Sequence, residues 1–149
     1  MERHERYMDE ALALARLAAA AGEVPVGCVI ADASGRIIGT GRNRCEERHD
    51  ATAHAEMEAI AGACRTLGHT HLEDCTLYVT LEPCPMCAGA VINARVGSVV
   101  YGAANELSGS CGSVIDLFFE RFGHAPSVIA GIRAAESSGL LRDFFSALR

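Results

Sequence analysis

The chain has 149 residues, half of them apolar, and carries a formal net charge of −6. This length predicts a single domain over residues 1–149, with enough apolar residues for a core that needs no disulfides. No apolar run is long enough to cross a membrane, and the charged N-terminal residues do not resemble a signal peptide. We therefore expect a cytoplasmic protein with no membrane partner. The negative charge argues against broad nonspecific binding to nucleic acid.

Apolar periodicity and turn residues predict alternating helices and strands along the chain. The expected helices cover residues 7–21, 53–67, 114–122 and 134–148, with one more starting at 84, and the expected strands cover 26–31, 36–40, 76–81, 96–101 and 128–132. A turn over residues 32–35 joins the first two strands into a hairpin. This alternation predicts an α/β fold, a three-layer α/β/α sandwich with a mixed central sheet of about five strands.

The chain contains seven cysteines, which fall into two groups. Five are scattered, and in a reducing compartment we expect these to be buried thiols: Cys28, Cys45, Cys64, Cys75 and Cys111. Cys84 and Cys87 differ, because they lie three positions apart at a predicted helix start, where Pro85 is favoured. Their spacing is compatible with a disulfide, a redox-active dithiol or half of a metal site.

A histidine and a glutamate at the head of the preceding helix, His54 and Glu56, favour the metal site. Zinc binds thiolate and imidazole ligands, and a catalytic zinc keeps one of four positions open. His54, Cys84 and Cys87 would supply three ligands, and the free N–H groups of a helix start stabilise thiolates. Glu56 is then free to move protons between an activated water and a leaving group.

The competing interpretations explain fewer residues. A redox dithiol would leave His54 and Glu56 without a role. A purely structural zinc normally needs a fourth ligand, and the nearest remaining histidine, His49, lies in a turn-like stretch. We therefore interpret His54, Glu56, Cys84 and Cys87 as a catalytic site that binds one Zn²⁺ per subunit.

These residues also carry a family resemblance. The motifs His-Ala-Glu at 54–56 and Pro-Cys-x-x-Cys at 83–87 resemble the signature of cytidine/deoxycytidylate-type zinc deaminases. Further stretches resemble the branch of bacterial tRNA adenosine deaminases: residues 23–27, 48–56, 76–84, 86–90, 102–103, 111–113 and 141–145. Together they extend over nearly the whole chain in order.

The resemblance implies a reaction and a set of site residues. His54, Cys84 and Cys87 would hold the zinc, and Glu56 would be the catalytic proton shuttle. The reaction would be hydrolytic deamination of adenosine to inosine at the wobble position of a tRNA anticodon stem-loop, carried out by a homodimer. The substrate would be bound by Asn43, Pro25, Val26, Ala55 and Asn105.

Two features depart from the family pattern. Asn105 lies where an aspartate is typical, and an uncharged amide is a weaker acceptor for a ribose 2′-hydroxyl, so we expect a softer preference for RNA over DNA. The chain stops at Arg149, whereas many relatives continue into a basic tail, which predicts weaker binding to phosphates.

The departures keep other functions open. A free base or nucleoside, such as guanine, cytosine, cytidine or adenosine, is the alternative substrate on the same fold. A non-catalytic zinc-binding protein is a third possibility, against which Glu56 argues.

Arg42, Arg44 and Arg48, beside Asn43, indicate either positive charge near the site or a solvated loop balanced by Glu46 and Glu47.

Overall fold

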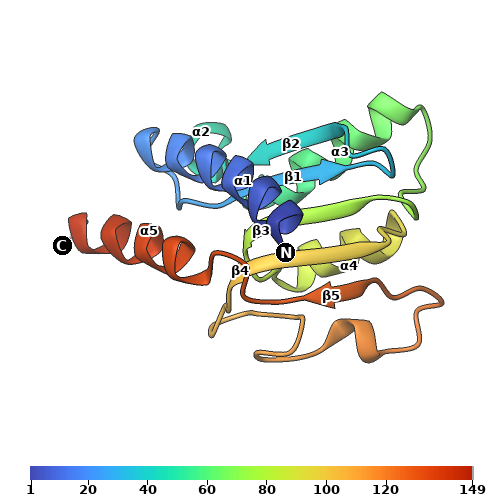
Figure 1. The fold of residues 1–149 in the computed structure, drawn as a ribbon. Coiled ribbons are helices and arrows are strands. Elements are labelled where there is room, and N and C mark those ends of the chain that lie inside the picture. The colour runs from blue at the N-terminus through green and yellow to red at the C-terminus, as the bar shows by residue number, and fades with distance from the viewer. Residues whose placement is uncertain (149) are drawn as a thin grey trace.

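The computed structural model describes residues 1–148, and a five-stranded mixed sheet lies at its centre. The strands are β1 (Gly27–Ala31), β2 (Ile37–Arg42), β3 (Thr76–Leu81), β4 (Ser98–Ala103) and β5 (Ser127–Ile129). Their order in the sheet is β2-β1-β3-β4-β5 (Figure 1). β1 pairs antiparallel with β2 and with β3, whereas β3, β4 and β5 run parallel.

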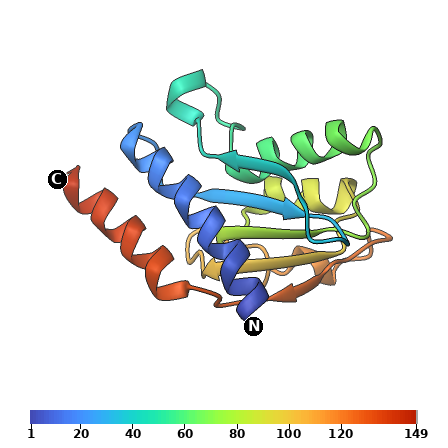
Figure 2. The same cartoon turned by 45° about the horizontal axis from the view of Figure 1, so that its top comes forward.

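Helices cover both faces of this sheet (Figures 1 and 2). On one face lie α1 (Glu2–Ala20) and α5 (Ala134–Ala147), and on the other lie α3 (Ala55–Leu67) and α4 (Pro85–Asn93). The short helices α2 (Cys45–Arg48) and η1 (Leu117–Phe119) interrupt loops. The predicted three-layer sandwich is therefore confirmed. Within residues 1–148, no helix has both the length and the apolar character that a membrane span requires.

Each face of the sheet has its own apolar core. Cys28, Ile30 and Val79 pack toward α3 and α4, while Val29 and Tyr78 pack toward α1. Successive strand residues point to opposite faces, so a strand covered on both sides is apolar at nearly every position. This explains why β1 is buried along its whole length.

Glycines in β2 let α3 approach the sheet closely. A Cβ built on Gly41 would lie 2.1 Å from the carbonyl oxygen of Ala55, and one on Gly39 would lie 2.3 Å from that of Ala59. The two glycines share a face because they are two positions apart. The start of α3, where His54 and Glu56 lie, is thereby held against the sheet.

The predicted helix over residues 114–122 is wrong, because only the three-residue turn η1 forms there. Backbone groups of this stretch bond elsewhere: the N–H groups of Val114 and Ile115 both donate to the carbonyl of Gly109. Asp116 then caps the short turn through the N–H of Phe118.

Other boundaries shift by a few residues. α1 begins at Glu2 rather than at residue 7, and β4 covers Ser98–Ala103 rather than 96–101. The polar segment before His54 contains the short helix α2, which the sequence did not indicate.

Candidate metal centre and substrate cavity

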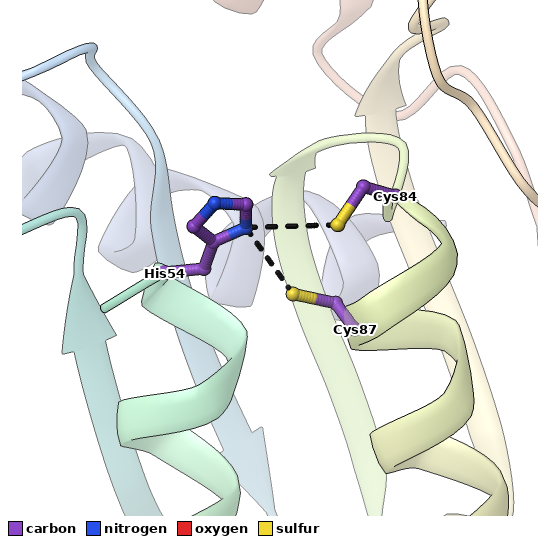
Figure 3. A group of neighbouring side chains, drawn as sticks. All are labelled: His54, Cys84 and Cys87. Atoms are coloured by element: carbon purple, nitrogen blue, oxygen red, sulfur yellow. Dashed lines mark hydrogen bonds between the residues drawn. The ribbon is translucent and has the colours of Figure 1, made fainter. Parts of the chain in front are cut away.

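The three predicted metal ligands lie together at the starts of two neighbouring helices (Figure 3). His54 is the N-cap residue of α3, and Cys84 is the N-cap residue of α4. Pro85 follows at the first helical position, where its missing N–H costs nothing, and Cys87 lies in the same first turn. Each ligand is thus fixed by a helix start packed on the sheet.

The spacing of the ligand atoms fits one zinc ion. His54 Nδ1 lies 3.6 Å from Cys84 Sγ and 3.5 Å from Cys87 Sγ, and all three ligand atoms lie within 4.8 Å of one another. A tetrahedral zinc with usual bond lengths separates a nitrogen and a sulfur ligand by about 3.5 Å. One imidazole and two thiolates leave the fourth position open, as in catalytic zinc sites.

The surroundings favour the thiolate form of Cys84. A hydrogen bond with the Cys87 thiol lowers the pKa of Cys84 to about 4, burial opposes this shift, and the hydrogen bond with His54 adds to it. The start of α4 contributes in the same direction through its free N–H groups. Because the thiolate is the form that binds metal, Cys84 is prepared for ligation.

Glu56 lies beside the ligands, in the first turn of α3. Its side chain is 4% exposed and lines the same cavity as His54 and Cys84. Burial raises the pKa of Glu56 to about 7, while its backbone hydrogen bond and His54 act in the opposite direction. A carboxyl group with a pKa near neutrality can both accept and release a proton.

A cavity of about 550 Å³ opens at this centre, within the usual size range of small-molecule sites. Four of the five predicted substrate-binding residues line it: Val26, Asn43, Ala55 and Asn105. The fifth, Pro25, is buried but is not among the lining residues, and its neighbour Val24 takes that place.

Asn43 is held with hydrogen-bonding capacity to spare. Its Nδ2 donates to the carbonyl of Val24 and its Oδ1 accepts from the N–H of Cys45, both at 3.4 Å. These are long hydrogen bonds, and an amide has a second N–H and a second lone pair. A ligand in the cavity can therefore use both ends of the Asn43 amide.

Several lining residues were not predicted from the sequence to belong to the site. They are Glu23, Val24, Cys45, Leu81, Glu82, Ser108, Phe144, Phe145 and Leu148. The rings of Phe144 and Phe145 meet edge to face with centroids 5.4 Å apart. The stretch 141–145 carries part of the family resemblance, but nothing local in it indicates that α5 reaches a site built by α3 and α4.

Two of the missed residues are buried carboxylates, each 1% exposed. Glu23 accepts hydrogen bonds from the backbone N–H groups of Glu46 and Glu47 at 3.0 and 2.7 Å. Glu82 bonds to the segment that follows β4. Burial raises the pKa of Glu82, but hydrogen bonds from Ser113, Asn105 and Cys111 outweigh it and bring the pKa below its ordinary value.

The arginines near Asn43 are paired with acidic residues. Arg42 lies 3.1 Å from Glu47, Arg44 lies 2.7 Å from Glu58, and Arg48 lies 3.5 Å from Glu58. The alternative of a charge-balanced loop is therefore the better description. The balancing residues are Glu47 and Glu58, rather than Glu46 and Glu47.

Comparisons with known proteins agree with this centre. Residues 1–103 match the model of the cytidine and deoxycytidylate deaminase zinc-binding region. The chain is 46% identical to the tRNA-specific adenosine deaminase of Bacillus subtilis, over 100% of the chain and 92% of that protein. A solved structure from a study of A-to-I editing by tRNA:A34 deaminases superposes with a TM-score of 0.87 at 42% identity, covering 91% of this chain and 99% of that one.

A larger relative contains only a region like this chain. The chain is 52% identical, over 95% of its length, to the tRNA(Ile)-lysidine synthase of Deinococcus radiodurans, of which it covers 24%. It thus spans about a quarter of the length of that relative.

The family match over residues 1–103 includes all three ligands and Glu56, and the identity to the Bacillus subtilis protein extends over nearly its whole length. The chain therefore belongs to the cytidine and deoxycytidylate deaminase family.

Proposed function

We propose that the chain is a zinc-dependent hydrolase that deaminates adenosine to inosine at the wobble position of a tRNA anticodon. The observation that carries the proposal is that Glu56 and Asn43 line the same cavity as His54 and Cys84. These two residues belong, with Cys87, to the candidate metal centre. The tRNA-specific adenosine deaminase of Bacillus subtilis, similar along the whole chain, supports this substrate. The lysidine synthase relative is also named for tRNA.

The chemistry divides between the metal and the protein. When bound by His54, Cys84 and Cys87, zinc supplies Lewis-acid activation of a water molecule. The Glu56 carboxylate accepts one proton from the attacking water and delivers it to the ring nitrogen. It then accepts the second proton, from the hydroxyl now attached to the ring carbon, and delivers it to the departing amine. Water is consumed, ammonia leaves, and a carbonyl replaces the exocyclic amine. Burial of Glu56 keeps this proton from exchanging with bulk water.

The cavity wall would orient the base. Asn43 would bond to the target nucleoside with its spare amide donor and acceptor. Val26 and Ala55 give an apolar surface for the ring, and the buried Pro25 would pack behind that wall. An anticodon base suits such a site because it is unpaired and costs little to move out of the loop.

The proposal includes a homodimer in the cytoplasm. Apolar side chains that one chain leaves exposed support association: Val114, Ile115, Phe119 and Phe122, all in or beside the loop around η1. Light scattering on the purified protein would test it, with twice the chain mass expected and the single-chain mass contradicting it.

A substrate panel tests the function. The zinc-loaded protein would be incubated with an anticodon stem-loop carrying adenosine at the wobble position, with its DNA counterpart, and with free adenosine, cytidine, cytosine and guanine. Mass spectrometry would detect the conversion of amine to carbonyl. We expect rapid inosine formation at the wobble position and no change in the free compounds. Activity confined to a free base or nucleoside would contradict the tRNA assignment while leaving the zinc chemistry intact.

A further inference from the structure

The loop of residues 104–110 forms part of the cavity wall, and the buried side chain of Glu82 holds it in place through hydrogen bonds. Glu82 Oε1 accepts the N–H of Asn105 at 3.1 Å, and Oε2 accepts those of Cys111 at 2.9 Å and Ser113 at 3.1 Å. Hydrogen bonds from backbone N–H groups to a buried carboxylate are strong and directional. The 104–110 loop therefore presents Asn105 and Ser108 to the cavity in a defined geometry.

The side-chain oxygen of Asn105 accepts hydrogen bonds from backbone N–H groups of its own loop. Its Oδ1 accepts the N–H of Leu107 at 3.2 Å and that of Ser108 at 3.1 Å. Two donors occupy the two lone pairs of this oxygen, so it has none left for a ribose 2′-hydroxyl, contrary to the expectation from the sequence. Because an amide NH₂ group cannot accept, this network also fixes which end of the side chain is the nitrogen. Nδ2 therefore faces Ser108 Oγ, at 3.1 Å.

This arrangement leaves the proton of Ser108 free. A hydroxyl has one proton to donate and two lone pairs, and Asn105 Nδ2 occupies one lone pair. Within residues 1–148, Ser108 Oγ makes no other hydrogen bond. The half-buried side chain lines the cavity, so a ligand there meets a hydroxyl that is already held by Asn105 and still has a proton to give.

We propose that Ser108 donates its hydroxyl proton to an acceptor oxygen in the sugar–phosphate backbone of the target nucleotide, and that Asn105 is the positioning residue that keeps this proton free. The inference rests on the proposed function, because it assumes a nucleotide in the cavity. A ribose 2′-oxygen and a phosphate or ring oxygen offer the same acceptor chemistry, and the two substrates below distinguish them.

Residue 105 determines whether the Ser108 hydroxyl accepts a hydrogen bond from it or donates one to it. In an Asn105→Asp variant, one carboxylate oxygen would still accept the N–H groups of Leu107 and Ser108. The other oxygen would replace Nδ2 and would accept the hydroxyl proton of Ser108. The hydroxyl would remain in place with its proton turned away from the ligand. Asn105→Asp therefore removes the donor without removing the side chain.

A double-mutant cycle tests the inference. kcat and KM would be measured on the anticodon stem-loop for the wild type, Ser108→Ala, Asn105→Asp and the double variant, all zinc-loaded. Losing one neutral hydrogen bond should lower kcat/KM by about 3- to 10-fold, mainly through KM. In the Asn105→Asp background, Ser108→Ala should cost less than in the wild type, because the proton is already engaged. Ser138→Ala, a matched exposed change on α5 that does not line the cavity, is the control and should leave kcat/KM unchanged.

A second substrate identifies the acceptor. If the loss caused by Ser108→Ala disappears on a stem-loop with 2′-deoxyadenosine at the target position, the acceptor is the 2′-oxygen. If the loss persists, the acceptor is a phosphate or ring oxygen. An unchanged kcat/KM for Ser108→Ala on both substrates, or equal losses in both backgrounds, would overturn the inference. A wild type that leaves the stem-loop unmodified would instead overturn the proposed function.

Discussion

The carboxylate of Glu23 accepts the backbone N–H of Glu47 at 2.7 Å, across 24 positions of the chain. The other carboxylate oxygen accepts the N–H of Glu46 at 3.0 Å, so one buried side chain satisfies the start of α2. The loop that carries Asn43 is thereby tied to the segment that leads into β1. Glu23 is a structural support for one wall of the cavity.

Glu23→Gln should weaken this support. A glutamine can accept only one of the two N–H groups and turns its own NH₂ toward the other. Loss of a hydrogen bond to a buried charged group costs about 2 kcal/mol, which urea unfolding would measure. Amide exchange should accelerate at Glu46 and Glu47 in particular. Glu10→Gln, an exposed change on α1, is the matched control, and equal stability of the two variants would contradict the role of Glu23.

Gly41→Ala should destabilise the protein through the contact between β2 and α3. The new Cβ would lie 2.1 Å from the carbonyl oxygen of Ala55, so the helix must move. Overpacking of this kind costs about 2 kcal/mol, measurable as a lower unfolding midpoint. Gly89→Ala is the control. Gly89 lies in α4, an added Cβ there would meet no atom within 4 Å beyond its chain neighbours and the nearby helix backbone, and alanine is the better helix former. A neutral Gly41→Ala would mean that α3 does not lie this close to the sheet.

Removing a ligand should remove the metal. Elemental analysis should give about one zinc per chain for the wild type and far less for His54→Ala, Cys84→Ala or Cys87→Ala. A chelator should lower the unfolding temperature of the wild type, because a metal that binds the folded state stabilises it. Cys64→Ala changes a cysteine on α3 outside the ligand group and should keep the metal. Full zinc content in a ligand variant would place the metal elsewhere.

Asn43→Ala should impair binding of the substrate without affecting the metal. The variant loses both ends of an amide that has spare hydrogen-bonding capacity in the cavity. We expect kcat/KM to fall by about tenfold or more, with unchanged zinc content. Asn93→Ala, at the exposed end of α4, should match the wild type. Comparable kinetics for the two variants would remove Asn43 from the binding site.

The sequence predicted the parts of this protein that depend on short stretches of chain. His54, Cys84 and Cys87 could be grouped because each ligand lies at a helix start, which proline and the neighbouring residues indicate locally. β1 and β3 were predictable because strands buried on both faces form continuous apolar runs. The sandwich follows from the alternation of such segments.

The parts that depend on distant contacts were not predictable in this way. Residues 114–122 have an apolar pattern typical of a helix. However, Glu82, about thirty positions earlier, accepts the backbone N–H of Ser113, and the carbonyl of Gly109 accepts the next two N–H groups. The sequence around Phe144 and Phe145 predicts a helix, but it does not show which element that helix contacts. Both residues line the cavity because of where α5 docks on the sheet, and no local pattern encodes that position.

The central claim is that Glu56 moves the proton at a zinc centre that it does not itself form. The most direct measurement compares the wild type with Glu56→Gln, both checked for equal zinc, for inosine formation at the wobble position of the stem-loop. The glutamine keeps the shape of the side chain and cannot accept a proton, so deamination should fall by at least about a hundredfold. A Glu56→Gln protein that retains its zinc and deaminates as fast as the wild type would contradict the account.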